Sequence, residues 1–374
     1  MRICIAAGTR PEAIKLAPVH KALLAREGWR SIWIASGQHG AVNDRALKAL
    51  GVAPDVKLAP PADAESLAGR LAHMIREFDH AFAALDPDMV LVQGDTSSTI
   101  AGALAAFCRQ IPIGHVEAGL RTFDLAAPFP EEGWRTLVGR LTALHFAPTG
   151  RAAANLRREG VPQSRVHVTG NTVIDALRSL PEGEGPFTAA PGRRLVGVTL
   201  HRRENWAAGV DQVVAALLQL RDRFDDLDLV FVAHGNPALA SRIRSQLQGE
   251  RSVTVCDPLD YPEFVGLMRA ATLMLSDSGG VQEEAPAFGV PVLVLRDTTE
   301  RMEAVEAGTA RLVGCDTAAI VDEASRLLSD AAAYEAMAKA ANPFGDGHAS
   351  ETIVELIARW GAERRTGAAA ALRA

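Results

Sequence analysis

The chain has 374 residues, of which 48% are hydrophobic and 22% are charged, and its formal net charge is −6. This length favours two domains over one hydrophobic core, and the negative charge argues against a nucleic-acid-binding protein. No apolar run reaches the roughly 18 residues that a membrane span needs, so we expect no membrane partner.

The cysteine pattern indicates a reducing compartment. The four cysteines are scattered along the chain: Cys4, Cys108, Cys256 and Cys315. No two of them form a C-x-x-C pair, so we expect thiols in the cytoplasm, with neither a zinc site nor a disulfide frame. The apolar start of the chain does not predict a signal peptide, because Arg10, Glu12 and Lys15 interrupt it.

Short apolar runs alternate with longer helical segments along almost the whole chain. The first half predicts strands at residues 2–7, 31–36, 89–94, 111–116, 143–148 and 165–170. The second half predicts strands at residues 194–200, 228–234, 253–257, 272–277, 291–296 and 310–314. Ala- and Leu-rich segments between them, such as residues 101–110 and 211–224, have apolar residues at helical spacing.

Strands without in–out alternation that are separated by helices predict parallel sheets with both faces covered. The two series of strands therefore predict two doubly wound α/β domains. Gly and Pro cluster in residues 170–194, after the sixth predicted strand. We therefore place a first domain at residues 1–168 and a second at residues 169–347.

Six predicted strands are followed by conspicuously polar segments. These segments are "GTRPEAIK" (8–15), "GDTSST" (94–99), "EAGLR" (117–121), "HRREN" (201–205), "HGNP" (234–237) and "SDSGGVQEE" (276–284). Any one of them can be explained as a turn with a helix cap. In open parallel sheets, however, ligands bind beyond the carboxyl ends of the strands. The six together predict one ligand cleft between the domains.

Residues 276–284 are typical of a phosphate site. A strand runs into Ser278, Gly279 and Gly280 and then into a helix, whose N-terminal N–H groups favour an anion. Glycine lets a diphosphate approach closely, and Glu283 or Glu284 could accept hydrogen bonds from a ribose. The alternative is a tight strand–helix connection. The fingerprints of dinucleotide and P-loop sites are absent from the sequence.

Cations follow two other predicted strands. Arg10 and Lys15 lie close enough in sequence to face one anion, and His201 stands beside Arg202 and Arg203. A histidine in such a place could contact a leaving group or act as an acid. The alternative interpretation of both groups is that they are solvated surface charges.

Carboxylates crowd the stretch "HVEAGLRTFDLAAPFPEEGWR", residues 115–135. Glu117, Asp124, Glu131 and Glu132 accompany Arg121 and Arg135. A core strand seldom ends directly in a carboxylate. Either these side chains form structural ion pairs, or they carry out chemistry.

These motifs together resemble those of the non-hydrolysing UDP-N-acetylglucosamine 2-epimerases. The resemblance is carried, in order from residue 8 to about 349, by "GTRPEAIKLAPV", "GDTSST", "GHVEAGLRT", "PFPEE", "VTGNTVIDAL", "HRREN", "SDSGGVQEEAPAFGVPVLVLRDTTER", "EAGTARLVG" and "NPFGDGHA". It implies a GT-B-like fold, in which two Rossmann-type domains face each other across a deep cleft. It also implies a homodimer, and a last helix (about 348–374) that packs back on the first domain.

The resemblance further implies interconversion of UDP-GlcNAc and UDP-ManNAc for cell-surface polysaccharide precursors, without NAD, other cofactor or metal. The implied route eliminates UDP to give 2-acetamidoglucal and then adds UDP back. Asp95, Glu117 and Glu131 match the family's acid/base carboxylates, and we favour Asp95 and Glu131 as the proton-transfer pair. The family's cations on the phosphate side of the substrate are matched by Arg10, Lys15, Arg135 and His201. Its UDP pocket is matched by Ser278, Gly279, Gly280, Glu284 and Arg301.

The chain departs from the family pattern at several positions. Trp134 stands where Asn is usual, Leu200 where Gly is common and Met302 where Pro is usual. In some relatives a second, activating sugar-nucleotide site lies in the region that matches Gln38, His39 and His234. Residues 40–42 lack the usual Arg-x-Met side chains, which argues against such activation here.

Three alternatives to this function stay open. One is a hydrolysing relative that releases ManNAc and UDP, or an epimerase for a related UDP-acetamidosugar. The second is a GT-B glycosyltransferase, which would not need three carboxylates in the first domain. The third is a sugar-nucleotide-binding relative without catalysis.

Overall fold

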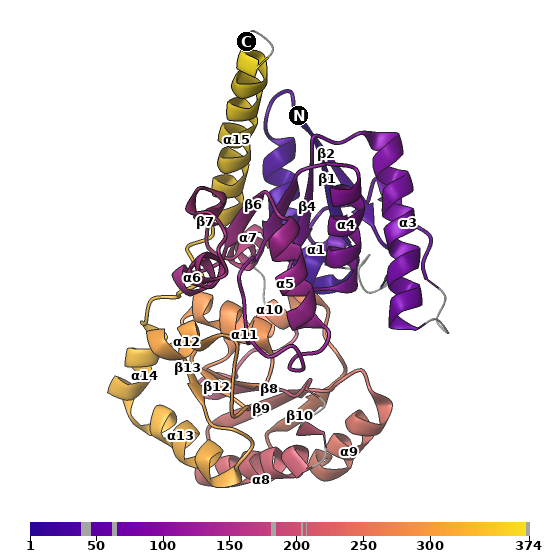
Figure 1. Ribbon diagram of the computed structural model, residues 1–374. Coiled ribbons are helices and arrows are strands. Elements are labelled where there is room, and N and C mark those ends of the chain that lie inside the picture. Colours follow the sequence, from indigo (N-terminus) through magenta and orange to yellow (C-terminus); the bar gives the residue numbers. More distant parts are fainter. Residues whose placement is uncertain (39–45, 62–65, 181–184, 203–204, 207, 372–374) are drawn as a thin grey trace. The chain divides into compact units, whose positions relative to one another are not determined.

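The computed structural model describes residues 1–38, 46–61, 66–180, 185–202, 205–206 and 208–371. The chain forms two compact units (Figure 1). Unit 1 consists of Met1–Leu180 and Phe344–Ala374, and unit 2 consists of Pro181–Pro343.

Unit 1 is built on a seven-stranded parallel sheet in the order β3-β2-β1-β4-β5-β6-β7. Its strands are β1 (Arg2–Ala7), β2 (Arg30–Ala35), β3 (Val56–Lys57), β4 (Met89–Gln93), β5 (Ile113–Val116), β6 (Leu144–Ala147) and β7 (Val166–Val168). All residues of β4 and β5 are buried. Such strands need helices on both faces, which explains why their sequences lack alternation.

Two groups of helices cover this sheet. The helices of unit 1 are α1 (Arg10–Leu24), α3 (Leu67–Leu85), α4 (Ser97–Cys108), α5 (Glu131–Leu141), α6 (Gly150–Arg158), η1 (Gln163–Arg165), α7 (Thr172–Ser179) and α15 (Ala349–Ala371). Helix α4 contacts α3 and α5, while α1 contacts α7 and α15. Phe78 and Phe82 of α3 pack with Val90 and Val92 of β4 in the core between sheet and helices.

Unit 2 repeats the doubly wound pattern with six parallel strands in the order β10-β9-β8-β11-β12-β13. They are β8 (Arg194–Thr199), β9 (Leu227–Val232), β10 (Val253–Cys256), β11 (Leu273–Ser276), β12 (Val292–Val294) and β13 (Ala310–Leu312). The helices are α8 (Ala208–Arg223), α9 (Pro237–Leu247), α10 (Tyr261–Ala270), α11 (Gly279–Glu284), η3 (Ala285–Phe288), α12 (Met302–Ala307), α13 (Thr317–Ser329) and α14 (Ala331–Ala338). The main core of this unit lies between its sheet and the helices α8, α9 and α13.

The predicted α/β class with two parallel sheets is confirmed. All twelve predicted strands are present within a few residues of their expected ends, and the structure adds the two-residue β3. The sequence placed the first domain boundary after residue 168. In the structure α7 packs against α1, and the chain leaves unit 1 only after Leu180.

The helix after unit 2 belongs to unit 1. Helix α15 contacts α1 and α7, and in Figure 1 it is the long yellow helix. Asp175 of α7 accepts hydrogen bonds from the backbone N–H groups of Ala349 and Ser350, at 3.3 and 2.7 Å. In the part of the chain that the structure describes, none of the helices combines the length and apolar composition that crossing a membrane requires.

Candidate active site

The strand order reverses once in each sheet. The reversal lies between β1 and β4 in unit 1 and between β8 and β11 in unit 2. At such a point the turns after the two strands diverge and leave room for a ligand. The predicted site residues of unit 1 follow β1, β4 and β5, and those of unit 2 mainly follow β8 and β11.

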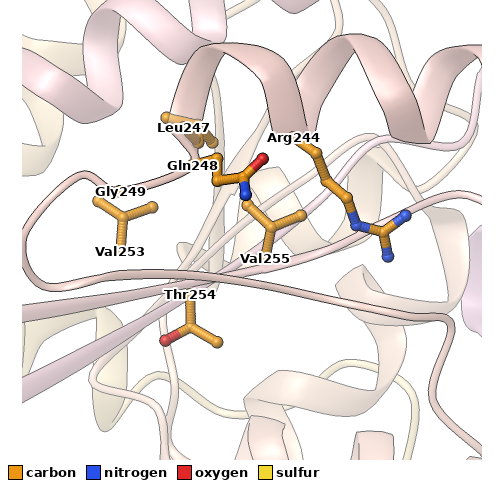
Figure 2. A pocket seen from close by; sticks show the side chains of 7 residues that line it. All are labelled: Arg244, Leu247, Gln248, Gly249, Val253, Thr254 and Val255. Atoms are coloured by element: carbon orange, nitrogen blue, oxygen red, sulfur yellow. The ribbon is translucent and has the colours of Figure 1, made fainter.

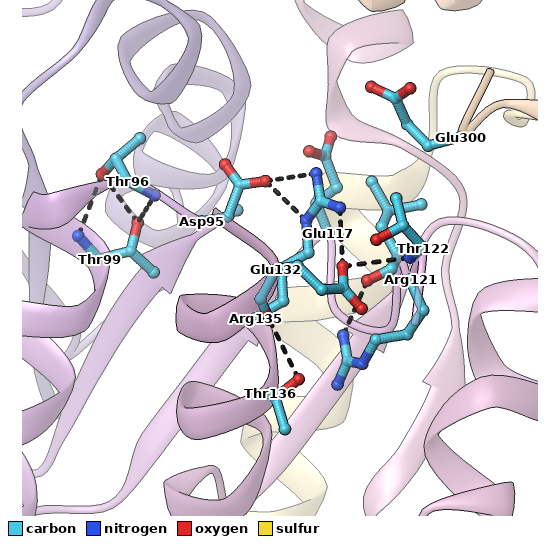
Figure 3. A network of polar contacts seen from close by, with 12 residues as sticks. Asp95, Thr96, Thr99, Glu117, Arg121, Thr122, Glu132, Arg135, Thr136 and Glu300 are labelled. Atoms are coloured by element: carbon cyan, nitrogen blue, oxygen red, sulfur yellow. Dashed lines mark hydrogen bonds and ion pairs between the residues drawn. The ribbon is translucent and has the colours of Figure 1, made fainter. Parts of the chain in front are cut away.

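Asp95 stands two residues after β4 and is held by Arg135 of α5 (Figure 3). The Arg135 guanidinium donates through Nε and Nη2 to Asp95 Oδ2, at 2.7 and 2.6 Å. Its Nη1 donates to Glu132 Oε2 at 3.1 Å. The Asp95 side chain keeps 25% of its surface exposed, whereas that of Arg135 keeps 7%. A fixed cation therefore holds an accessible carboxylate in one orientation.

Glu117 follows β5 directly and is more enclosed than Asp95. It forms an ion pair with Lys15 of α1, and both side chains are at most 8% exposed. Its carboxylate also accepts hydrogen bonds from the side-chain amides of Gln93 and Asn171, at 3.1 and 3.0 Å. Its φ of 61° is unfavourable for a non-glycine residue, and such strain is often found at functional sites.

Glu131 and Arg10 are less enclosed than these two carboxylates. Glu131 is the first residue of α5, beside the buried Glu132, and is itself half-buried. Arg10 is exposed at the first position of α1. Both side chains are therefore accessible to a ligand.

Buried polar contacts anchor the loop between Glu117 and Glu131. Arg121 donates to both carboxylate oxygens of Glu159, at 2.6 and 3.0 Å. Glu132 accepts from the backbone N–H groups of Thr122 and Phe123, at 3.1 and 3.0 Å. Of the structural ion pairs considered from the sequence, Arg135 forms one with Glu132, whereas Arg121 pairs with Glu159 outside that stretch. The strand-end carboxylates Glu117 and Asp95 pair with Lys15 and Arg135.

A neutral histidine joins the ends of β4 and β5. The imidazole of His115 lies 2.8 Å from the carbonyl oxygen of Gly94, the residue before Asp95. Burial lowers the pKa of His115 to about 4, so the ring is neutral at pH 7. Since a carbonyl oxygen can only accept, the hydrogen of the neutral ring is on Nε2.

In unit 2 the glycine turn follows β11. Ser278, Gly279 and Gly280 lead into α11, and a Cβ on Gly280 would lie 3.2 Å from Glu284 Oε1. The guanidinium of Arg301 packs against Gly279, because a Cβ there would lie 3.0 Å from its Cζ. Arg301 also pairs with Glu283 and Glu300, at 2.9 and 2.7 Å. Arg301 thus lies against this turn in a fixed orientation.

His201 follows β8 and is held through its backbone. The buried carboxylate of Asp277, at the end of β11, accepts from the N–H groups of His201 and Arg202, at 2.7 and 2.9 Å. The His201 ring lies 5.6 Å from the ring of His234, which follows β9. The structure therefore brings His201 and His234 together within unit 2.

An open pocket of about 410 Å³ lies between the end of α9 and β10 (Figure 2). Its lining includes Arg244, Leu247 and Thr254 and none of the predicted site residues. Among the described residues, no group of three or more His, Cys, Asp or Glu side chains could hold a metal ion.

Comparison with known proteins gives consistent matches over nearly the whole chain. The family described as UDP-N-acetylglucosamine 2-epimerase matches residues 21–358. A probable UDP-N-acetylglucosamine 2-epimerase of Ralstonia nicotianae is 46% identical, over 95% of this chain and 98% of its own. The UDP-N-acetylglucosamine 2-epimerase of Escherichia coli K12 is 43% identical, over 96% of this chain and 98% of its own.

The chain belongs to the UDP-N-acetylglucosamine 2-epimerase family. The crystal structure of the UDP-GlcNAc 2-epimerase from Neisseria meningitidis bound to UDP-GlcNAc matches with a TM-score of 0.90 and 40% identity, over 96% of this chain and all of that one. The glycotransferase of kitacinnamycin, 15% identical with a TM-score of 0.65, shares the fold. The GT-B-like fold class is thereby confirmed.

Trp134 is the clearest departure from the family pattern near the site. It lies on α5 between Glu132 and Arg135, and its indole packs against the core formed by α3, α4 and the sheet. Its ring nitrogen is buried, with no hydrogen-bond partner among the described residues. The indole therefore serves the core of unit 1 and does not extend the carboxylate cluster.

The residues expected at a second sugar-nucleotide site are only partly described. Gln38 accepts a hydrogen bond from the Ser98 hydroxyl at 2.7 Å. His234 accepts one from the backbone N–H of Asn236 at 2.9 Å. His39 lies outside the described residues, as do residues 40–42.

Sequence reasoning missed several buried polar residues that support the site. They are Glu12, Gln93, Asn171 and Asp277, each hydrogen-bonded near a strand end. A signal existed for Glu12, because Thr9-x-x-Glu12 is a capping box. Asp277 could have been noticed as an acid directly after a strand.

Proposed function

We propose that this family member interconverts UDP-GlcNAc and UDP-ManNAc by the non-hydrolysing route. The C2 proton of the sugar is removed, and the C1–O bond to UDP breaks with its electron pair leaving on UDP. This gives 2-acetamidoglucal and UDP. Addition of UDP to C1 and of a proton to the other face of C2 then gives the epimer.

The proposal is carried by three carboxylates of unit 1, of which Asp95 and Glu131 are accessible and Glu117 is enclosed. Asp95 is accessible and oriented by Arg135, whereas Glu117 is enclosed by Lys15, Gln93 and Asn171. Inverting a carbon centre by proton transfer requires groups that act on opposite faces. We assign proton transfer to Asp95 and Glu131, and a tuning or relay role to Glu117.

The departing diphosphate requires positive charge and N–H donors. We assign this role to Arg10, Lys15, Arg135 and His201. We assign the binding of UDP to the turn Ser278–Gly280 together with Glu284 and Arg301. Gly279 supports this, because the absence of a Cβ lets the Arg301 guanidinium lie directly against the turn.

An exchange experiment tests the function. Purified protein incubated with UDP-GlcNAc in D2O should form UDP-ManNAc that carries deuterium at C2, measured by proton NMR and mass spectrometry. An epimerised product that retains its C2 hydrogen would contradict proton removal. Accumulation of free ManNAc and UDP would favour the hydrolysing alternative, and binding without turnover would favour a non-catalytic relative.

Two wider proposals rest on the family resemblance. We propose a homodimer, which light scattering of the purified protein tests. We also propose that the product feeds cell-surface polysaccharide synthesis, for which a deletion strain should lack polymer containing ManNAc or a sugar derived from it.

A further inference from the structure

Glu12 is a fully buried carboxylate at the reversal point of the unit 1 sheet. It lies in the first turn of α1, directly after β1, and none of its surface is exposed. Neither the family motifs considered above nor the proposed chemistry gives it a role. A buried carboxylate is costly unless its oxygens are well hydrogen-bonded, so its contacts indicate what it does.

Each oxygen of Glu12 holds a different turn. Oε2 accepts from the backbone N–H groups of Gly8 and Thr9, at 3.0 and 2.7 Å. Oε1 accepts from the hydroxyls of Thr96 and Thr99, at 2.8 and 3.2 Å. The first turn continues into Arg10 and the second begins at Asp95. One side chain therefore connects the backbone segments that carry these two predicted site residues.

The two turns are also packed closely against each other. A Cβ on Gly8 would lie 1.9 Å from Ser36 Oγ and 2.1 Å from Ser98 Oγ, so the turn after β1 is pressed against α4. The Thr99 hydroxyl also lies 2.6 Å from the Gln93 carbonyl oxygen, so its single hydrogen is shared between that oxygen and Glu12 Oε1. The Gln93 side chain contacts Glu117. Glu12 thus bonds directly to the turns after β1 and β4, and Thr99 and Gln93 connect this network to Glu117 after β5.

All four donors to Glu12 are neutral groups. The length of its side chain therefore matters more for holding both turns than its negative charge does. An amide in place of the carboxylate could turn its oxygen toward the two backbone N–H groups, which can only donate. Its NH2 group could then donate to the two threonine hydroxyls, which can also accept. A glutamine therefore fits the same network, whereas an aspartate is one methylene too short to hold both turns.

We propose that Glu12 is a positioning residue that fixes the turn bearing Arg10 relative to the turn bearing Asp95. Unit 2 has a similar arrangement at its own reversal point, where Asp277 at the end of β11 holds the turn after β8. The inference rests on the proposed function, because Arg10 and Asp95 matter only if they act on the substrate.

Two conservative variants separate reach from charge. Glu12→Gln keeps the reach and removes the charge, and Glu12→Asp keeps the charge and shortens the reach. We expect Glu12→Gln to keep most of the wild-type kcat/KM and its pH profile. We expect Glu12→Asp to lose about 100-fold in kcat/KM, the order of effect of misplacing a catalytic group by about 1 Å. Asp175→Ala, which removes a buried carboxylate that holds α15, controls for a general loss of stability.

Each outcome decides the proposal. Loss of activity in Glu12→Gln with UDP binding retained would overturn it, because the charge or the proton would then matter. Wild-type kcat/KM in Glu12→Asp would also overturn it. All variants are assayed below their melting temperatures, and a matching loss of kcat/KM in Asp175→Ala would assign the effect to stability and overturn the proposal.

A structural measurement keeps the inference separate from the proposed function. If the wild-type protein does not epimerise UDP-GlcNAc, the proposed function fails. Crystal structures of the wild type and both Glu12 variants still report the separation of Thr9 and Asp95. An unchanged Thr9–Asp95 separation in Glu12→Asp would refute the positioning role of Glu12. A wider separation in Glu12→Asp, but not in Glu12→Gln, would support it.

Discussion

At the scale of single residues, Asp95 and Glu117 illustrate how neighbouring carboxylates acquire different environments. Glu117 is enclosed by Lys15 and two side-chain amides, which leave its oxygens little freedom. Asp95 has one guanidinium partner and a partly exposed side chain. A group that exchanges protons with a substrate must remain accessible, which is why we assign that role to Asp95 and not to Glu117.

Substitution of the assigned proton-transfer residues should impair chemistry more than binding. We expect Asp95→Asn and Glu131→Gln each to lower kcat by about 100- to 10,000-fold, the usual contribution of a general acid or base. UDP affinity, measured by calorimetry, should change little. Wild-type rates in both variants would refute the assignment.

Arg301→Ala, by contrast, should chiefly weaken UDP binding.

The buried Glu12 should make stability depend on pH. Burial raises the pKa of this carboxyl above its ordinary value of 4.5, against the effect of its hydrogen bonds. The folded state therefore binds the proton more tightly than the unfolded state, so protonation of Glu12 stabilises the fold. That stabilisation is present below about pH 4.5 and is lost as the pH rises through the folded-state pKa. Glu12→Gln does not titrate there.

We therefore expect the stability of Glu12→Gln relative to the wild type to increase over that pH window and then level off. Urea unfolding of both proteins at a series of pH values measures the difference. A difference that is independent of pH, or one that changes in the opposite direction, would contradict the raised pKa. Comparison with Asp175→Ala separates this effect from that of Asp175, another buried acid of unit 1.

At the scale of elements, the sequence predicted strands better than it predicted side-chain partners. Twelve apolar runs gave twelve strands, because buried parallel strands need continuous apolar residues. The strand β3 was missed because Val56 and Lys57 pair only with Ile34 and Ala35 at the sheet edge and show no apolar run. Parallel packing also predicted that the polar segments follow neighbouring strands.

The partners of the site residues were not predictable, because they come from distant parts of the chain. Asn171 contacts Glu117 from a position 54 residues away, and Arg135 reaches Asp95 over 40 residues. A single sequence carries no signal for such pairs beyond residue type. The packing of Trp134 was not predictable for a related reason, since sequence spacing did not show that its indole faces the core.

The junction between α7 and α15 should contribute measurably to the stability of unit 1. Asp175 accepts from two backbone N–H groups at the start of α15 in a buried site, so Asp175→Ala leaves those donors unpaired. We expect a loss of about 1 to 3 kcal/mol in the free energy of unfolding. Asp330→Ala removes an exposed helix cap on α14 and should cost less. Equal losses of unfolding free energy in the two variants would contradict the larger contribution that we expect from the buried site.

At the scale of the whole molecule, each unit has its own hydrophobic core. The core clusters of unit 2 contain only residues between 187 and 337, and its six strands form one sheet of their own. We expect a fragment of residues 181–343 to fold by itself, with cooperative thermal unfolding by circular dichroism. A fragment of residues 1–180 lacks α15 and should be less stable than the same fragment joined to residues 344–374. A disordered 181–343 fragment would contradict the division.

The return of α15 to unit 1 has a consequence for biosynthesis. The ribosome makes residues 181–343 after the first 180 residues and before α15. Throughout that interval the surfaces of α1 and α7 that α15 covers face water on the nascent chain. The unit begun first is thus completed last, and a translational pause after residue 343 would lengthen its exposure to chaperones and to aggregation.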